Sequence, residues 1–294
     1  GSTLLTTQPA YDKRDAKAVV PEAMPLVREY RRRTAGSSSV LPRKRGFETG
    51  GDRKYRSIWL TADFKNADDS IGLFAYEFAK ALNRPDIPQG FVIMSSGNKT
   101  SMASPLSWTS FAGIKDMANP AFQPRLNALL LQDPNSAVSQ IAIADFLKAL
   151  KAEIAKISAM AANGENMSAA PLGLPGFPDA SSNKSVPPDT IPTFTYNWCV
   201  SPLTPMGVSG VVWIPDATNI GYTPAEYASE LEIYARSLPA TYGQANVPFY
   251  YAHPNATLVP GITPANIPGA KSVEFSAWPR NLKEIATALG TASK

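Results

Sequence analysis

The sequence contains one histidine, His253, and one cysteine, Cys199. A disulfide needs two cysteines, and a zinc site of Cys and His ligands needs a cluster of them, so both are excluded within this chain. His253 is the only imidazole that can serve as a general base, and it needs a nucleophile within about 3 Å to do so. A histidine bonded to backbone at a strand end is the simpler interpretation, and Cys199, among apolar residues, is expected to be a buried, inert thiol. The candidate nucleophiles for such a base are Ser95, Tyr251 and Thr257.

The composition is typical of a folded globular protein. Of 294 residues, 44% are apolar and 18% are charged, and 27 are prolines, which indicate many ordered loops. We expect a single domain over residues 1–294. No stretch approaches the roughly 18 apolar residues of a membrane span, and no signal-peptide pattern opens the chain. Gly1-Ser2 looks like a remnant of cloning, so we expect that the natural N-terminus, with any export signal, has been removed.

The net charge of +4 is unevenly distributed. Residues 28–56 hold ten basic side chains against three acidic ones. A patch of this kind can bind nucleic acid, anionic glycans or an acidic partner, and its plainest interpretation is a solvated loop region with internal ion pairs. Aromatic residues are not interleaved with these charges in the way typical of single-strand binding, so nucleic acid is disfavoured as a partner.

The elements that must position any site follow from apolar periodicity. Spacings of three and four residues predict helices over residues 71–82, 136–160, 223 to about 238, and from about 279. Continuous apolar or β-prone runs predict strands over residues 3–7, 57–64, 90–94, 207–214 and 247–252.

Three of these segments carry finer signals. Thr223-Pro224-Ala225-Glu226 is a capping box with proline at the first helical position. Residues 163–195 are rich in Gly, Pro, Ser and Asn and predict an irregular excursion inserted in the domain. The apolar face of the 136–160 helix is formed by Ile141, Phe146, Leu147, Leu150, Ile154 and Ile157.

Strands that alternate with helices, and that read as nearly continuous apolar runs, indicate a parallel sheet covered on both faces. We therefore expect an α/β fold, a three-layer α/β/α sandwich with a mostly parallel sheet. In such folds the reactive groups lie in loops beyond the carboxyl ends of the strands. Here these ends are Gln8-Pro9, residues 95–100, residues 215–219 and His253-Pro254.

Several ordered blocks carry a resemblance to a known family. They are Tyr196-Asn197, Pro202-Leu203, residues 207–213, the helix after Thr223, the strand over residues 248–251, the 71–82 helix with its following strand and Ser95-Ser96, and the tail over residues 278–285. In this order they resemble the sialate O-acetylesterases of the SGNH (GDSL-like) hydrolase family. The resemblance implies ester hydrolysis on acetylated sugars by a serine nucleophile, a histidine–aspartate pair and an oxyanion hole. It also suggests an exported or cell-surface location.

At the positions that match the family's catalytic groups, this sequence departs from the pattern. Pro9 stands where the serine nucleophile is expected, and Trp278 stands where the histidine base is expected, with Ser276 near the position of the acid. Asn98 replaces a glycine of the second block, although Thr100 is kept, and in the third block Trp213 and Asn219 survive. The resemblance therefore implies a scaffold without a catalytic residue at these positions.

The same loops hold candidate ligand-binding residues. Asn219 can donate to a ligand or cap the following helix, and Trp278 can stack on a sugar ring or fill the former cleft. Asp216 can bind a cation or a sugar hydroxyl, but one carboxylate is a poor metal site, and no metal or cofactor is expected. The full set of ligand-binding candidates is Thr100, Trp213, Asp216, Asn219, His253 and Trp278.

Three functions remain open from the sequence. The first is a catalytically inactive SGNH-like domain that serves as a structural, assembly or binding module, with a protein partner or a second copy of itself. The second is an active carbohydrate acetylesterase, or another hydrolase, that uses substituted residues. The third is a glycan-binding module that uses the former active-site cleft.

Overall fold

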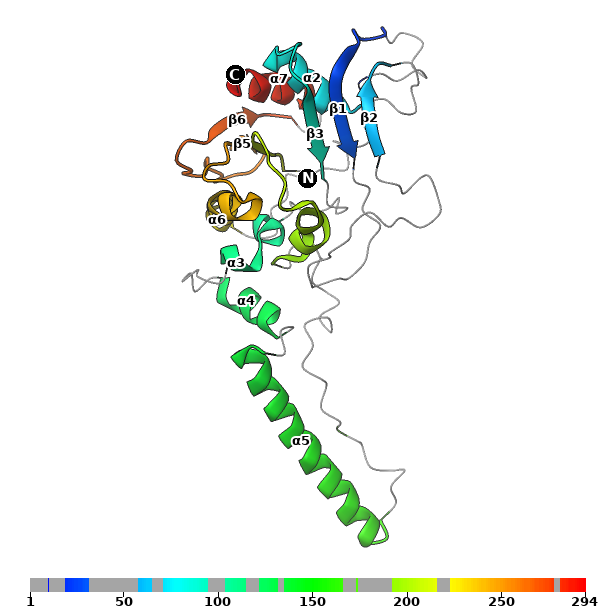
Figure 1. The fold of residues 1–294 in the computed structure, drawn as a ribbon. Helices are drawn as coiled ribbons and strands as arrows, with labels where there is room; N and C mark the ends of the chain where they lie inside the picture. The colour runs from blue at the N-terminus through cyan, green and yellow to red at the C-terminus, as the bar shows by residue number, and fades with distance from the viewer. Residues whose placement is uncertain are drawn as a thin grey trace. The chain divides into compact units, whose positions relative to one another are not determined.

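The structure is a computed structural model, and it describes residues 10, 19–31, 58–64, 71–94, 104–114, 122–131, 135–165, 173, 192–215, 223–277 and 281–294 (Figure 1). The chain divides into two compact units. Unit 1 comprises Gly1–Asp116 and Pro187–Lys294, and unit 2 comprises Met117–Val186. Each unit is described by itself below.

The first sheet of unit 1 has three strands in the order β2-β1-β3. They are β1 (Met24–Arg31), β2 (Ile58–Ala62) and β3 (Gln89–Ile93). β2 pairs antiparallel with β1, whereas β3 pairs parallel with it. β2 and β3 confirm the predicted strands, and β1 was not predicted because charged residues interrupt its apolar pattern.

The second sheet is wholly parallel, in the order β4-β5-β6. Its strands are β4 (Val211–Trp213), β5 (Phe249–Pro254) and β6 (Lys271–Phe275). Aromatic residues, which favour strands, dominate β5. The described residues thus form a mixed α/β fold with two small sheets, one of them parallel, where the sequence predicted one mostly parallel sheet.

Three long helices cover these sheets: α2 (Leu73–Leu82), α6 (Pro224–Tyr242) and α7 (Leu282–Ala292). The predicted capping box is confirmed, since the Thr223 hydroxyl accepts from the Glu226 N–H at 3.2 Å and the Glu226 carboxylate accepts from the Thr223 N–H at 2.8 Å. α2 and α7 pack side by side (Figure 1). Their contact is close enough that a Cβ at Gly290 would lie 2.5 Å from the Phe78 carbonyl oxygen.

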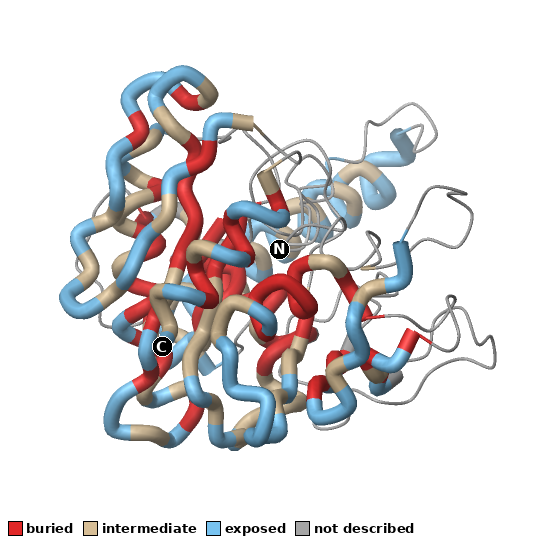
Figure 2. Tube along the Cα trace, turned by 90° about the horizontal axis from the view of Figure 1, so that it is seen from above, coloured by how far each residue is buried: buried red, intermediate tan, exposed pale blue. Residues whose placement is uncertain are grey.

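The two faces of strand β5 pack against different helices. Phe249 and Tyr251 of β5 belong to the cluster built on α6, whereas Ala252 belongs to the cluster that contains α2 and α7 residues. Ile93 of β3 lies in that second cluster too, together with Ile214 beyond β4. Buried residues gather along the strands and the covering helix faces (Figure 2). Both sheets of unit 1 therefore pack against the same helix pair.

Four short helices of unit 1 lie between β3 and β4 in the sequence. They are η3 (Pro105–Trp108), α3 (Phe111–Ile114), η8 (Tyr196–Val200) and η9 (Ser201–Leu203). Hydroxyl groups join them, because Ser107 Oγ and Thr195 Oγ1 lie 2.6 Å apart. Most of the predicted excursion over residues 163–195 lies outside the described residues, whereas residues 192–195 are described and Thr193 is buried.

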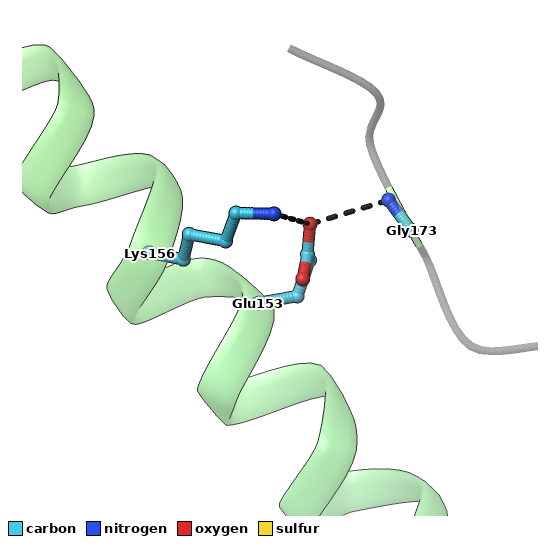
Figure 3. Close-up of polar contacts among 3 residues, drawn as sticks. All are labelled: Glu153, Lys156 and Gly173. Atoms are coloured by element: carbon cyan, nitrogen blue, oxygen red, sulfur yellow. Dashed lines mark hydrogen bonds and ion pairs between the residues drawn. The ribbon is translucent and has the colours of Figure 1, made fainter.

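Unit 2 contains α4 (Gln123–Leu130) and α5 (Ala137–Ala162) in its described part. α5 confirms the helix predicted over residues 136–160, and Ser136 caps it by accepting from the Ser139 N–H at 3.0 Å. Glu153 accepts from the Gly173 N–H at 3.2 Å and lies 3.7 Å from Lys156 (Figure 3).

The apolar face expected on this helix is not buried. Ile141 is 64% exposed, Leu147 46% and Ile154 53%. The described part of unit 2 holds no strand against which such a face could pack. None of the helices in the described ranges is long and apolar enough to cross a membrane.

Candidate functional site

The carboxyl ends of β4, β5 and β6 meet at one edge of the parallel sheet, where the sequence predicted the functional loops. Pro215 follows β4, His253 and Pro254 end β5, and Ser276 follows β6. This edge is therefore the candidate site, and the side chains that it presents decide what chemistry it can do.

His253 is buried at this edge, with 8% of its surface exposed. Its Nδ1 lies 3.1 Å from the Pro254 carbonyl oxygen, an arrangement that the Nδ1–H tautomer satisfies. Its ring centroid lies 6.0 Å from that of Tyr251. In the described part of the chain, no hydroxyl or thiol lies within hydrogen-bonding distance of the imidazole. This is the backbone-bonded histidine that the sequence favoured.

Tyr251 does not supply a nucleophile here, because its hydroxyl donates to the Ala265 carbonyl oxygen at 2.9 Å. Burial raises the pKa of Tyr251, and the hydrogen bonds to Ser272 and Ala265 oppose that rise. The phenol is therefore neutral and bonded at neutral pH. Thr257 is exposed, and Ser95 lies outside the described residues.

The loop between β6 and α7 is closed by reciprocal bonds. The Ala277 N–H donates to Asn281 Oδ1 at 2.7 Å, and the Asn281 N–H donates to the Ala277 carbonyl oxygen at 3.0 Å. Ser276 is exposed at the start of this loop. Trp278, the position that matches the family's base, lies between the two bonded residues but outside the described ones.

Trp213 lies in the core of unit 1. It is 5% exposed, and its indole N–H donates to the Tyr227 hydroxyl at 2.7 Å. Its ring meets Trp108 edge to face at 6.0 Å between centroids and lies 5.1 Å from Tyr234. Burial raises the pKa of Tyr234 well above its usual value. The Trp213 ring thus packs against Trp108 and Tyr234, and all three side chains line a cavity of about 600 Å³ in unit 1.

The other predicted positions lie outside the described residues. They are Pro9, Asn98, Thr100, Asp216 and Asn219. The structure therefore does not bring these positions together or separate them. In the described ranges, no group of three or more His, Cys, Asp or Glu side chains could hold a metal ion. Cys199 is buried, as predicted.

Two fully buried carboxylates escaped the sequence analysis. Glu29 of β1 accepts from the Gly72 N–H at 2.6 Å, at the start of α2. Glu230 of α6 accepts from the Ser104 hydroxyl at 2.6 Å, at the start of η3. Each carboxylate joins a long element to the beginning of a distant helix. The apolar neighbours of Glu230 on its helix face, Tyr227 and Tyr234, were the signal for its burial.

Neither a protein-family model nor a curated protein matches this sequence. A solved structure does match. The fold resembles that of a carbohydrate acetylesterase from Xanthomonas citri. The TM-score is 0.54 at 18% sequence identity, and the match covers 99% of this chain and 53% of the other. The chain thus spans about half the length of that protein.

At this identity the likeness concerns the fold alone. It agrees with the carbohydrate-esterase resemblance of the sequence blocks and extends over nearly the whole chain. The chemistry therefore has to be argued from this chain's own residues.

Proposed function

We propose that this chain is an SGNH-type domain, a three-layer α/β/α sandwich that has lost its hydrolytic groups and serves as a structural, assembly or binding module. The observation that carries the proposal is the state of the only imidazole in the sequence. His253 is buried in β5 and bonded to backbone, with no hydroxyl or thiol of the described residues at hydrogen-bonding distance. A serine hydrolase needs the opposite arrangement, because an unactivated hydroxyl is a weak nucleophile at neutral pH.

Two further observations support the proposal. The fold likeness to a carbohydrate acetylesterase supports a hydrolase ancestry for the scaffold. The sequence carries Pro9 and Trp278 at the positions that match the nucleophile and the base, and neither side chain can fill those roles. A scaffold with this ancestry and these side chains has no evident route to ester hydrolysis.

The helix α5 supports a role in contacts. Its exposed apolar side chains, which include Ile141 and Ile154, are of the kind that mark interaction surfaces. A glycan-binding role finds less support, because Trp213, one of the candidate ligand-binding residues, is buried and bonded to Tyr227.

The deciding experiment is an esterase assay with p-nitrophenyl acetate and an acetylated oligosaccharide. We expect hydrolysis no faster than in a matched solution of heat-denatured protein, and the same rate for His253→Gln. Turnover that is lost in His253→Gln, in a variant that keeps the wild-type tryptophan emission and melting temperature, would overturn the proposal. Ser276→Ala is the matched control, since Ser276 is exposed at the same edge.

A glycan titration separates binding from structural roles. We expect no saturable heat signal with acetylated oligosaccharides. Saturable binding without turnover, abolished by Trp278→Ala, would instead assign the glycan-binding function to this domain.

A further inference from the structure

The β2-β1-β3 sheet has one face on α2 and an opposite face that carries exposed side chains (Figure 1). Val27 and Leu60 belong to a cluster that includes α2 residues, so they mark the covered face. Because successive strand residues alternate between faces, their neighbours Arg28 and Trp59 lie on the opposite one. Trp59 is 58% exposed, and Arg28 is exposed too. This surface is the outer face of the sheet.

The Trp59 side chain reaches from β2 across β1. Trp59 is paired with Tyr30 of β1, and the two ring centroids lie 5.2 Å apart. At the far end of the indole, Cη2 would lie 3.9 Å from a Cβ placed on Gly90 of β3. The Tyr30 ring and the backbone at Gly90 thus support the indole, while more than half of its surface stays exposed.

Arg28 lies beside this indole. It is paired with Gly90 of β3, which puts it one step along the same face from the Tyr30–Trp59 pair. Diagonal neighbours of this kind lie within about 8 Å of each other. One guanidinium nitrogen, Nη1, donates to the Pro25 carbonyl oxygen at 2.7 Å, which orients the group. No carboxylate in the described ranges forms an ion pair with Arg28, so its charge can serve a ligand.

The sequence next to this pair of side chains is strongly basic. Arg31, which ends β1, is paired with Ile58, which begins β2, so the segment between them starts and ends one residue from the Tyr30–Trp59 pair. Residues 28–56 hold ten basic side chains against three acidic ones. The charge of this part of the chain therefore favours an anionic ligand on the outer face.

We propose that the outer face binds an acidic polysaccharide, with one uronic acid ring stacked on Trp59 and its carboxylate paired with Arg28. A tryptophan ring offers a large apolar surface to the C–H face of a sugar. A planar guanidinium binds a carboxylate through two parallel hydrogen bonds. The site lies on a different sheet from the β4-β5-β6 edge, so this inference does not depend on whether that edge hydrolyses esters.

Single-stranded nucleic acid fits the outer face less well. Proteins that bind it stack successive bases on several aromatic side chains. Among the described residues of β1, β2 and β3, Trp59 is the one aromatic side chain in the exposed class. One stacking residue beside one oriented guanidinium matches a single sugar ring with a single acidic group.

The first test titrates the full chain with hexagalacturonic acid, which carries carboxylates and no acetyl ester. We expect saturable binding by calorimetry in dilute buffer, weakened at high salt because exposed ion pairs are screened there. Cellohexaose is the neutral control and should bind at least about tenfold more weakly, since it offers Arg28 no carboxylate. No saturable binding of hexagalacturonic acid, or equal binding of the two sugars, would overturn the proposal.

The second test separates this site from general attraction to a basic chain. Trp59→Ala and Arg28→Gln should each weaken binding of hexagalacturonic acid by about tenfold, and Trp59→Phe should keep part of the affinity. Arg236→Gln is the matched control, because Arg236 is exposed on α6 and the variant loses the same charge. All four variants should keep the wild-type melting temperature. Equal losses of affinity in Arg28→Gln and Arg236→Gln would contradict a defined site.

The third test compares classes of ligand. Hexaglutamate and a thymidine hexanucleotide should both bind more weakly than hexagalacturonic acid, because neither offers a sugar ring with its own carboxylate. If the hexanucleotide binds more tightly and loses affinity in Trp59→Ala, the face is a nucleic-acid site and the proposal is wrong. Ester hydrolysis, measured on the same samples, should be absent from wild type and Trp59→Ala alike, so this inference and the proposed loss of catalysis fail separately.

Discussion

Helices α7 and α5 both carry a stripe of leucine and isoleucine residues. The stripe of α7 is buried, whereas that of α5 is exposed. In α7, Leu282, Ile285 and Leu289 are at most 1% exposed. In α5, Ile141 and Ile154 are more than half exposed. α7 packs on α2 and on strand residues of the β4-β5-β6 sheet, whereas the described part of unit 2 offers no sheet. An apolar stripe thus forms a helix locally, and its burial requires a partner from elsewhere in the chain.

The largest expected difference is between two isoleucine truncations. Ile285→Ala should lower the free energy of unfolding by about 2–5 kcal/mol, because it leaves a cavity in the α2–α7 cluster. Ile154→Ala should change it by about 0.5 kcal/mol or less. Urea unfolding measures both, with tryptophan emission for unit 1, which holds all five tryptophans, and circular dichroism for α5. Equal losses of unfolding free energy in the two variants would contradict the difference in burial between α7 and α5.

The next effect is a loss of stability of unit 1 at high pH. Burial raises the pKa of Tyr242 to about 12. An unfolded phenol ionises near pH 10, so the unfolded state gains charge above pH 10 while the folded phenol stays neutral. Stability is therefore complete below pH 10 and falls by about 3 kcal/mol as the pH rises to 12.

The measurement is the urea midpoint of tryptophan emission at pH 9 and at pH 11.5. In Tyr242→Phe the fall between these pH values should be smaller. Unit 2 contains no tyrosine, so the phenolate effect should be absent from the signal of α5. An identical fall in wild type and variant would remove Tyr242 as its source.

A smaller loss is expected at the helix contact. Gly290→Ala places a Cβ 2.5 Å from the Phe78 carbonyl oxygen and 2.9 Å from Ala81 Cβ. The backbone must shift, at a cost of about 1–3 kcal/mol, although alanine is the better helix former. Ala149→Gly in exposed α5 is the opposite change and should cost about 1 kcal/mol of local helix stability. If Gly290→Ala raises the melting temperature, the α2–α7 contact is looser than described.

The smallest effects are expected from removing the N-caps of α5 and α6. Ser136→Ala and Thr223→Ala each remove an N-cap bond worth about 1 kcal/mol. In α5 the loss should appear as faster hydrogen exchange in the first turn, where Ser139 is buried but Ala137 and Gln140 are exposed. In α6 the first turn should stay protected, since buried residues such as Tyr227 hold it. Equal fraying in both helices would contradict this distinction.

The predictable part of the fold lies in segments whose local signals agree. The capping box at Thr223, the apolar run that became β3 and the start of α5 near residue 136 were all predicted from neighbouring residues. β1 and β6 were missed because each includes charged residues that break the apolar pattern. β6 tolerates them on exposed positions, whereas β1 buries Glu29 by bonding it to Gly72.

In the candidate site, too, some residues were predictable from the sequence and others were not. The backbone-bonded state of His253 and the burial of Cys199 followed from residue type and neighbours. The core position of Trp213 did not, because a tryptophan suits a ligand and a core equally well until its N–H partner is known. Tyr227, which accepts that N–H, lies on a helix beyond the next loop.

The sequence by itself located the four helices α2, α5, α6 and α7 and the strands β2, β3, β4 and β5, since caps, breakers and periodicity act over a few residues. It also determined the scarcity of catalytic groups, because one histidine and one cysteine set that limit before folding. Only the tertiary structure decided which stripes are buried and which carboxylates are paired. These depend on residues far apart in the chain, such as Glu230 and Ser104, and no local pattern records such a pairing.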